Sequence, residues 1–235
     1  RKKGQKVAAK RADREAAEGV VLAKISDDNK FAAAVMINCE TDFVAKNQDF
    51  ISYVQSVVDL AVENSARTLD ELKALKLGDR TIEESIIDKT GVIGEKIQIG
   101  KYEVVEAEGV YAYIHPGNRI ASIAGLNKAG EEFAAAGHDV VMQIAAMAPV
   151  AVDKERIPEE IIQREIEIGK EQARQEGKPE AMIERIAMGK LNKFFKENTL
   201  LNQAFIKDSK KNIQQYLQSF DKELTVTDFK RLALG

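Results

Sequence analysis

The chain has 235 residues, which allows one large domain or two small ones around hydrophobic cores. Its net charge of −3 does not indicate a polyanion-binding protein, and no apolar run approaches the roughly 20 residues of a membrane helix. The single cysteine, Cys39, excludes an intrachain disulfide and is typical of a cytoplasmic protein. Because the chain starts at Arg1, without a methionine or a signal peptide, we expect that a segment upstream was removed or never included.

The first 17 residues are strongly basic, with seven Lys or Arg, two acidic residues and a local charge of +5. Alanine and long charged side chains favour a helix, although the apolar spacing is poor. We therefore expect residues 1–17 to form an exposed basic helical linker. A nucleic-acid-binding arm is an alternative, but it is disfavoured because no aromatic residue lies among the charges.

Two β-prone runs, residues 18–26 and 31–38, flank an Asp-Asp-Asn turn, which predicts a β-hairpin. Apolar residues then recur at the spacing of an amphipathic helix. They are Phe50, Tyr53, Val54, Val57, Val58 and Ala61. A second helix is predicted from Thr81, whose pairing with Glu84 is a capping-box pattern, and residues 97–105 predict a further strand.

An internal repeat organises the chain. Glu18–Val21 returns as Glu108–Tyr111 about 90 residues later, and Asn29–Ala32 returns in the same way as Asn118–Ala121. A strand and a helix follow each copy. The predicted fold class is therefore α+β, with two duplicated subdomains whose small antiparallel sheets are covered by helices.

The expected first core subdomain spans residues 18–107, and the second combines residues 108–154 with residues 196–235. Residues 155–195 show narrow apolar seams on two helical segments around a Gly-Lys-Pro turn, which predicts an inserted antiparallel coiled-coil hairpin. Ser209 is expected to cap a helix beyond the hairpin. The hairpin also offers a surface for a homodimer.

The residues that carry covalent or metal chemistry are sparse. The two histidines, His115 and His138, have no cysteine or carboxylate at metal-ligand spacing, and no phosphate-binding glycine loop occurs. Cys39 ends an apolar strand, where a buried and inert thiol is the usual state. We therefore expect no metal, no cofactor and no enzyme activity, which leaves an interaction protein.

One segment differs between the two copies of the repeat. The first copy places Asp42 and Phe43 between its strand and its helix, where the second copy reads Asn127 to Phe133. The shared scaffold does not explain this Asp-Phe pair. Two interpretations stay open: Phe43 is an exposed aromatic anchor for a partner, or it staples the next helix to the sheet.

The run from Asn38 to Lys46 resembles the signature of the elongation factor Ts family, the guanine-nucleotide exchange factors of the GTPase elongation factor Tu. The resemblance continues in order along the chain. Further matching segments are Ala8–Val20, Ile93–Ile97, His115–Ile120, Gly177–Pro179 and Lys193–Phe195. The family normally begins with a three-helix, ubiquitin-associated-like domain, and nothing in this sequence corresponds to it, so we expect that domain to be lacking.

The resemblance implies a mechanism in which four consecutive residues press against the GTPase domain near the nucleotide phosphates. They are Thr41, Asp42, Phe43 and Val44. Phe43 would wedge between helices of elongation factor Tu, the elements that hold Mg²⁺ would shift, and GDP would exchange for GTP. Ile93 and Gly94 would pack beside those Mg²⁺-holding elements on the same GTPase domain, and His115 would touch another domain of the partner. An RNA-binding protein, or a dimerising scaffold without exchange activity, is the alternative.

Overall fold

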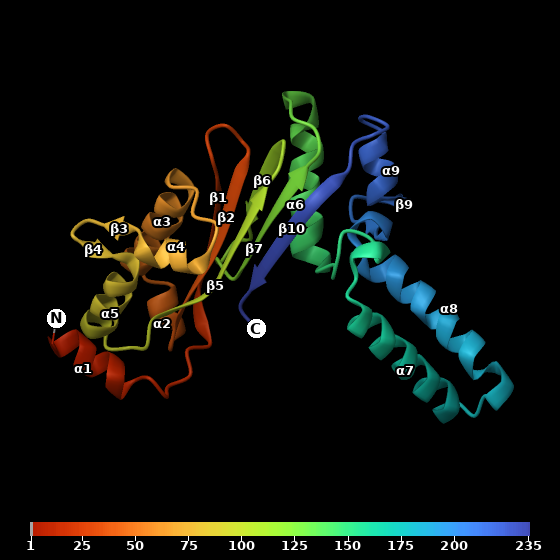
Figure 1. Ribbon diagram of the computed structural model, residues 1–235, viewed down its shortest axis with the longest axis horizontal. Coiled ribbons are helices and arrows are strands. Elements are labelled where there is room, and N and C mark those ends of the chain that lie inside the picture. The colour runs from red at the N-terminus through yellow and green to blue at the C-terminus, as the bar shows by residue number, and fades with distance from the viewer. Residues whose placement is uncertain (1) are drawn as a thin grey trace. The chain divides into compact units, whose positions relative to one another are not determined.

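The computed structural model describes residues 2–235, which form two compact units (Figure 1). Unit 1 comprises the residues up to Ala145 together with Thr227–Gly235, and unit 2 comprises Ala146–Val226. The α+β class with small antiparallel sheets is confirmed. The expected subdomain boundaries stay a prediction, because both three-stranded sheets lie in unit 1. Along residues 2–235, none of the helices combines the length and the apolar character needed to span a membrane.

Unit 1 contains most of the strands. They are β1 (Glu18–Ile25), β2 (Phe31–Cys39), β3 (Lys76–Leu77), β4 (Arg80–Thr81), β5 (Gln98–Glu106), β6 (Gly109–Ile114), β7 (Ile120–Leu126) and β10 (Val226–Ala233). Its helices are α1 (Lys2–Lys10), α2 (Asp42–Ala45), α3 (Gln48–Glu63), α4 (Leu69–Ala74), α5 (Ile82–Ile93), the 3-10 turn η1 (Glu131–Phe133) and α6 (Ala134–Met147).

The two sheets have the same strand order, β1-β2-β5 and β6-β7-β10. Each begins with a hairpin, in which Glu18 pairs with Cys39 in the first sheet and Gly109 with Leu126 in the second. Each then adds a third strand beside the second one after a helical excursion. The repeat seen in the sequence is therefore a repeat of topology.

The two hairpins contact each other reciprocally through their turns. The Val21 N–H donates to the Asn118 carbonyl at 2.8 Å, and the Val110 N–H donates to the Asn29 carbonyl at 2.8 Å. Asn29 and Asn118 occupy corresponding turn positions with φ of 56° and 58°, a left-handed conformation that asparagine tolerates better than most residues. Val21 and Val110 each lie eight residues before the asparagine of their own turn, so backbone groups at matching positions of the two hairpins satisfy each other.

The same contact is repeated by two ion pairs and a shared core. Arg119 pairs with Glu18 at 2.6 Å, and Lys30 pairs with Glu108 at 3.4 Å, again between corresponding positions. Apolar side chains from both sheets form one buried cluster between them. Its members include Val21, Ala23, Ala32, Ala34, Met36, Val110, Ala121 and Ile123. Burial of this apolar area, rather than the exposed ion pairs, holds the two sheets together.

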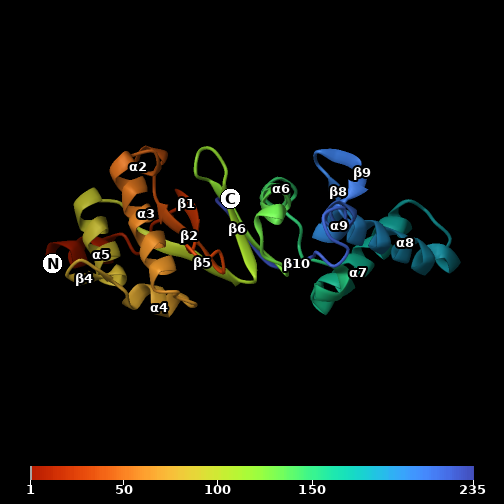
Figure 2. The ribbon, with the colours of Figure 1, turned by 90° about the horizontal axis from the view of Figure 1, so that it is seen from above.

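Helix α3 packs on β1 and β2 (Figure 2). The apolar stripe predicted for this helix is confirmed, because all six of its residues are buried. Asn47 begins the helix by accepting from the Asp49 and Phe50 N–H groups. The first sheet, α3 and α5 thus enclose one hydrophobic core, and α2 packs on the edge of this core.

Two caps test the helix predictions. The capping box is confirmed, since the Thr81 hydroxyl accepts from the Glu84 N–H and the Glu84 carboxylate accepts from the Thr81 N–H. The expected cap at Ser209 is wrong. Ser209 lies in β9 (Asp208–Asn212), and Asn212 begins the next helix through a capping box with Gln215. Asparagine caps as well as serine, so spacing to the apolar residues decides the position.

Unit 2 consists mainly of helices. Its elements are η2 (Lys154–Arg156), α7 (Glu159–Gln175), α8 (Glu180–Asn198), η3 (Leu200–Asn202), β8 (Ala204–Phe205), β9 and α9 (Ile213–Gln218). Helices α7 and α8 pack as a hairpin whose turn contains Gly177 at φ 72°. Gly169 lies against Ala187, so small residues let the two helices approach closely. The Leu200 N–H donates to the Ala151 carbonyl at 2.9 Å, which holds the ends of this segment together.

Candidate functional site

The connection between β2 and α3 presents an exposed aromatic side chain. Thr41 begins the short helix α2, and its hydroxyl accepts from the Val44 N–H at 3.4 Å. Phe43 on this helix is 84% exposed, which is the highest exposure of any phenylalanine among residues 2–235. A side chain so accessible to water packs little on the sheet, so it contributes little as a staple of the next helix.

The second copy of the repeat provides a comparison within the same molecule. Phe133 lies in the 3-10 turn η1, between the second strand and the helix of that copy, and it is only 6% exposed. The scaffold can therefore bury a phenylalanine at this point. In the first copy the scaffold leaves the phenylalanine exposed, so the apolar surface of one large side chain faces solvent.

The end of α5 contributes a second exposed apolar residue, Val92, at 85% exposure. Ile93, which the resemblance proposed as a contact, is half-buried against the core. Phe43 and Val92 lie along one groove of about 420 Å³. The residues lining it are Phe43, Val44, Asn47, Asp49, Phe50, Lys89, Val92 and Ile93. The structure thus joins the Thr41–Val44 segment to the end of α5 in one surface.

Glu95 fixes the geometry of this surface. Its carboxylate accepts from the Glu40 and Thr41 N–H groups, both at 3.0 Å, and from the Thr41 hydroxyl at 2.6 Å. Gly94 ends α5 in the left-handed conformation, at φ 79°, and so directs the chain to this point. Charged acceptors form stronger hydrogen bonds than neutral ones. Glu95 therefore holds the start of α2 on the end of α5.

Glu40 makes the reciprocal connection. Its carboxylate accepts from the Lys96 N–H at 2.7 Å and from the Arg11 guanidinium at 2.9 Å, and its side chain is 15% exposed. The Lys96 N–H, followed by the Arg11 charge, lowers the pKa of Glu40 below its ordinary value. Neither Glu40 nor Glu95 was identified from the sequence, where single acidic residues in loops carry no signal.

Asp42 and Cys39 have local roles at this site. The Lys46 ammonium donates to the Asp42 carboxylate at 3.0 Å, and this bond lowers the pKa of Asp42. Both side chains are exposed, so the pair adds little stability. The Cys39 thiol donates to the Thr41 carbonyl at 3.2 Å, and burial raises the pKa of Cys39 to about 12. The thiol is therefore protonated and unreactive at neutral pH.

His115 belongs to the other sheet, on the turn between β6 and β7. Its Nδ1 lies 2.9 Å from the Tyr113 hydroxyl, and its ring is exposed. The structure therefore brings Thr41–Val44, Ile93 and Gly94 together, while His115 lies on a separate element. Within residues 2–235, no group of three or more His, Cys, Asp or Glu side chains is placed to hold a metal ion.

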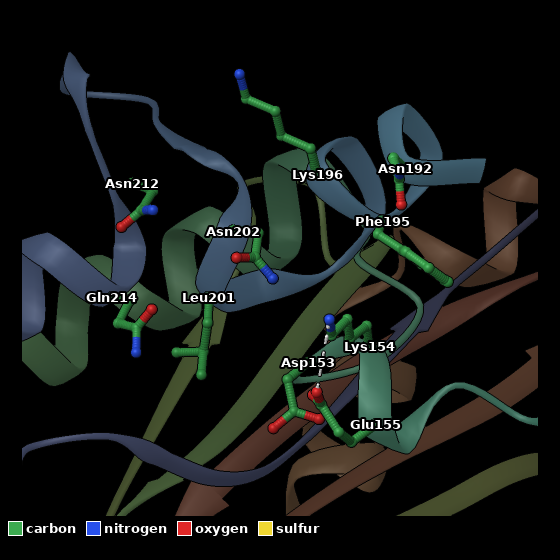
Figure 3. Close-up of a pocket in the computed structure, with 10 residues that line it drawn as sticks. All are labelled: Asp153, Lys154, Glu155, Asn192, Phe195, Lys196, Leu201, Asn202, Asn212 and Gln214. Carbon is green, nitrogen blue, oxygen red and sulfur yellow. Dashed lines mark ion pairs between the residues drawn. The ribbon is translucent and has the colours of Figure 1, made fainter. Parts of the chain in front are cut away.

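A larger hollow, of about 560 Å³, lies in unit 2 (Figure 3). Polar side chains line most of it, and three of them already bind neighbouring groups of the chain. Asp153 accepts from the Arg156 N–H at 3.2 Å, Asn202 donates to the Thr199 hydroxyl at 2.8 Å, and Asn212 caps α9. Residues that cap helices and turns in this way do not form a binding site by themselves.

The fold and the site define a duplicated α+β protein with an exposed apolar pair on α2 and the end of α5, which hydrogen bonds join, a surface of the kind that contacts other proteins. The model of the family described as elongation factor TS matches residues 40–235. The protein named elongation factor Ts from Porphyromonas gingivalis is 51% identical over 236 residues, covering 100% of this chain and 85% of that relative. Namesakes from Cytophaga hutchinsonii and Christiangramia forsetii are 50% and 48% identical, with the same coverage. This chain belongs to the elongation factor Ts family, whose members serve translation elongation in protein biosynthesis.

Proposed function

We propose that this chain binds elongation factor Tu in its GDP form and promotes exchange of GDP for GTP. Membership of the family supports this proposal. The observation that carries it is the contrast between Phe43, which is 84% exposed, and Phe133, which is 6% exposed at the corresponding point of the repeat. An exposed aromatic side chain on a rigid support is typical of an interface anchor.

The mechanism begins with the placement of Phe43 against the GTPase domain of the partner. Phe43 enters between helices of that domain, and Val92 adds a second apolar contact at the other side of the groove. Because Glu95 holds Thr41 by a charged hydrogen bond of 2.6 Å, the wedge does not yield when it meets the partner. The partner's Mg²⁺-holding elements move instead.

The remaining site residues have supporting roles in this proposal. Gly94 turns the chain so that Glu95 reaches Thr41, and Ile93 anchors the end of α5 in the core. His115 touches a different domain of the partner from its own turn. Asp42 lies on the exposed rim beside Phe43, where its charge is screened by water and by Lys46.

Exchange then follows from thermodynamic linkage, without a covalent step by this chain. The factor binds the nucleotide-free GTPase more tightly than the GDP-bound GTPase. The bound factor must therefore weaken the binding of GDP by the same ratio as GDP weakens the binding of the factor. A coupling of about 4 kcal/mol weakens nucleotide binding roughly a thousandfold. GTP replaces GDP by mass action, in the cytoplasm where the two elongation factors meet.

Self-association through the α7–α8 hairpin is a further part of the proposal. Ile168, Met182 and Met188 on these helices are 42–45% exposed. A polyanion-binding role for the basic segment is less well supported, because the Arg11 guanidinium is already paired with Glu40.

The test is GDP release from elongation factor Tu loaded with a fluorescent GDP analogue. In the presence of excess GTP, substoichiometric amounts of this chain should accelerate the fluorescence change many times over the spontaneous rate. An inactive protein of similar size and charge is the control. If saturating amounts of folded chain leave the release rate at its spontaneous value, the proposed function is wrong.

A further inference from the structure

The segment that precedes β1 packs on the functional site. In both views α1 lies beside α5 (Figures 1 and 2), and the two helices are in contact. Within residues 2–14, the half-buried residues are Gly4, Val7, Ala8 and Arg11. Their spacing of three, one and three residues places them on a single helical face. This face is the one that α1 turns towards α5.

The crossing of the two helices requires glycine. A Cβ atom built on Gly91 of α5 would lie 2.5 Å from the Gly4 Cα of α1, closer than real Cβ contacts allow. The obstacle is backbone rather than a flexible side chain, so the helices would have to separate to admit it. Backbone contact of this kind makes the docking specific in position, although little apolar area is buried.

The residues that follow α1 bind both loops of the site. The Arg11 guanidinium donates to both Glu40 carboxylate oxygens, at 3.0 and 2.9 Å. The Lys96 ammonium donates to the carbonyl groups of Ala12 and Arg14, at 2.7 and 3.1 Å. Glu40 and Lys96 also join the two loops to each other, through the Lys96 N–H, beside the bonds that Glu95 makes.

We propose that residues 2–14 form a strap that positions the partner-binding surface. Docked on α5 and tied to Glu40 and Lys96, the strap holds the end of α5 and the start of α2 in one fixed arrangement. Phe43 and Val92 then present a preformed surface, which lowers the ordering cost of binding. Gly91 and Arg11 are positioning residues, since neither needs to touch the partner.

This strap rests on the proposed function only for its effect on nucleotide exchange. Its structural effect is measured in the free protein, by hydrogen exchange of the backbone amides of Glu40 and Thr41, whose N–H groups donate to the Glu95 carboxylate. The two variants are Gly91→Ala, which forces the helices apart, and Arg11→Gln, which removes the tie to Glu40. Arg11→Lys is the conservative rescue variant.

Each variant has a matched control. Gly189→Ala also replaces a helical glycine, in α8, but a Cβ there meets nothing within 4 Å. Lys10→Gln removes the same charge from an exposed position on α1. Both control variants should keep the wild-type amide exchange at Glu40 and Thr41, because a Cβ at Gly189 meets no neighbour and the exposed Lys10 makes no buried contact.

We expect amide exchange at Glu40 and Thr41 to rise about tenfold in Gly91→Ala and Arg11→Gln, with wild-type unfolding midpoints. The concentration for half-maximal GDP release should rise several-fold while its maximal rate stays unchanged, and Arg11→Lys should restore part of the affinity. If both variants keep wild-type amide exchange at these two positions, the strap does not position the loop and the proposal is wrong. If the wild type itself releases no GDP, the proposed function fails, while the amide exchange still decides the strap.

Discussion

The contrast between the two phenylalanines of the repeat predicts opposite effects of the same substitution. Phe133→Ala removes a side chain that is 6% exposed, and truncation of a buried phenylalanine costs about 3–5 kcal/mol. For a protein of this size that lowers the unfolding midpoint by roughly 10 °C. Phe43→Ala removes a side chain that is 84% exposed, so the free energy of unfolding should change by about 0.5 kcal/mol or less.

The effect on function should be reversed. A central aromatic anchor contributes about 2 kcal/mol or more to binding, which corresponds to roughly a 30-fold lower second-order rate of stimulated GDP release for Phe43→Ala. Phe133→Ala, corrected for its folded fraction, should keep the wild-type rate. Thermal unfolding and release of fluorescent GDP are measured on the same two preparations.

One result would refute this reasoning. If Phe43→Ala loses several kcal/mol of stability while its folded fraction exchanges GDP normally, Phe43 belongs to the core and is no wedge. The loss of stability expected in Phe133→Ala is the control, because it shows that the unfolding measurement detects truncation of a buried phenylalanine.

Four further outcomes are expected. Val92→Ala should slow GDP release without lowering the unfolding midpoint, since Val92 is 85% exposed, and an unchanged rate excludes it from the interface. The pKa of Glu40 is lower in the folded chain than in the unfolded chain, where it is about 4.3. The stability that Glu40 contributes is therefore complete above the unfolded pKa and is lost as the pH falls through the folded pKa. Glu40→Gln should abolish this acid-induced loosening of the loop. Cys39 should react with a thiol reagent at pH 8 only after unfolding, and rapid labelling of the native chain contradicts its burial. Replacing residues 155–195 by a short loop should leave unit 1 folded, as circular dichroism and hydrogen exchange would report, because Ala151 and Leu200 are already joined.

The sequence predicted those parts of the fold whose signal is local and repetitive. The α3 stripe is apolar at every helical position that faces the sheet, and the box at Thr81 needs only two residues three apart. The repeat indicated two similar sheets without any knowledge of their contact. The stripe and the capping box depend on residues close together in the chain, and the repeat on the likeness of short segments about 90 residues apart.

The parts that could not be predicted depend on packing. The face of α1 that lies on α5 carries Gly4, Val7 and Ala8, and a single large apolar residue among them is too few to reveal the buried face as an apolar pattern. Val92 does have a signal, because it lies off the spacing of Ile82, Ile86 and Ile93 on α5, the face that packs on the core. The Glu95 carboxylate binds Thr41, which lies 54 residues earlier in the chain, and local sequence patterns do not predict a contact at that separation.

The reciprocal contact between the two hairpins has the form of an isologous interface, in which each half offers the same groups to the other. Two separate, identical chains meeting in this way would display every surface loop twice, on faces related by the twofold axis. Joining the halves in one chain removes that obligation. One half exposes Phe43 while the other turns Phe133 inwards, so a molecule with nearly symmetric architecture has a single copy of this aromatic face. Under the proposed function, each chain therefore offers one copy of this face to the GTPase.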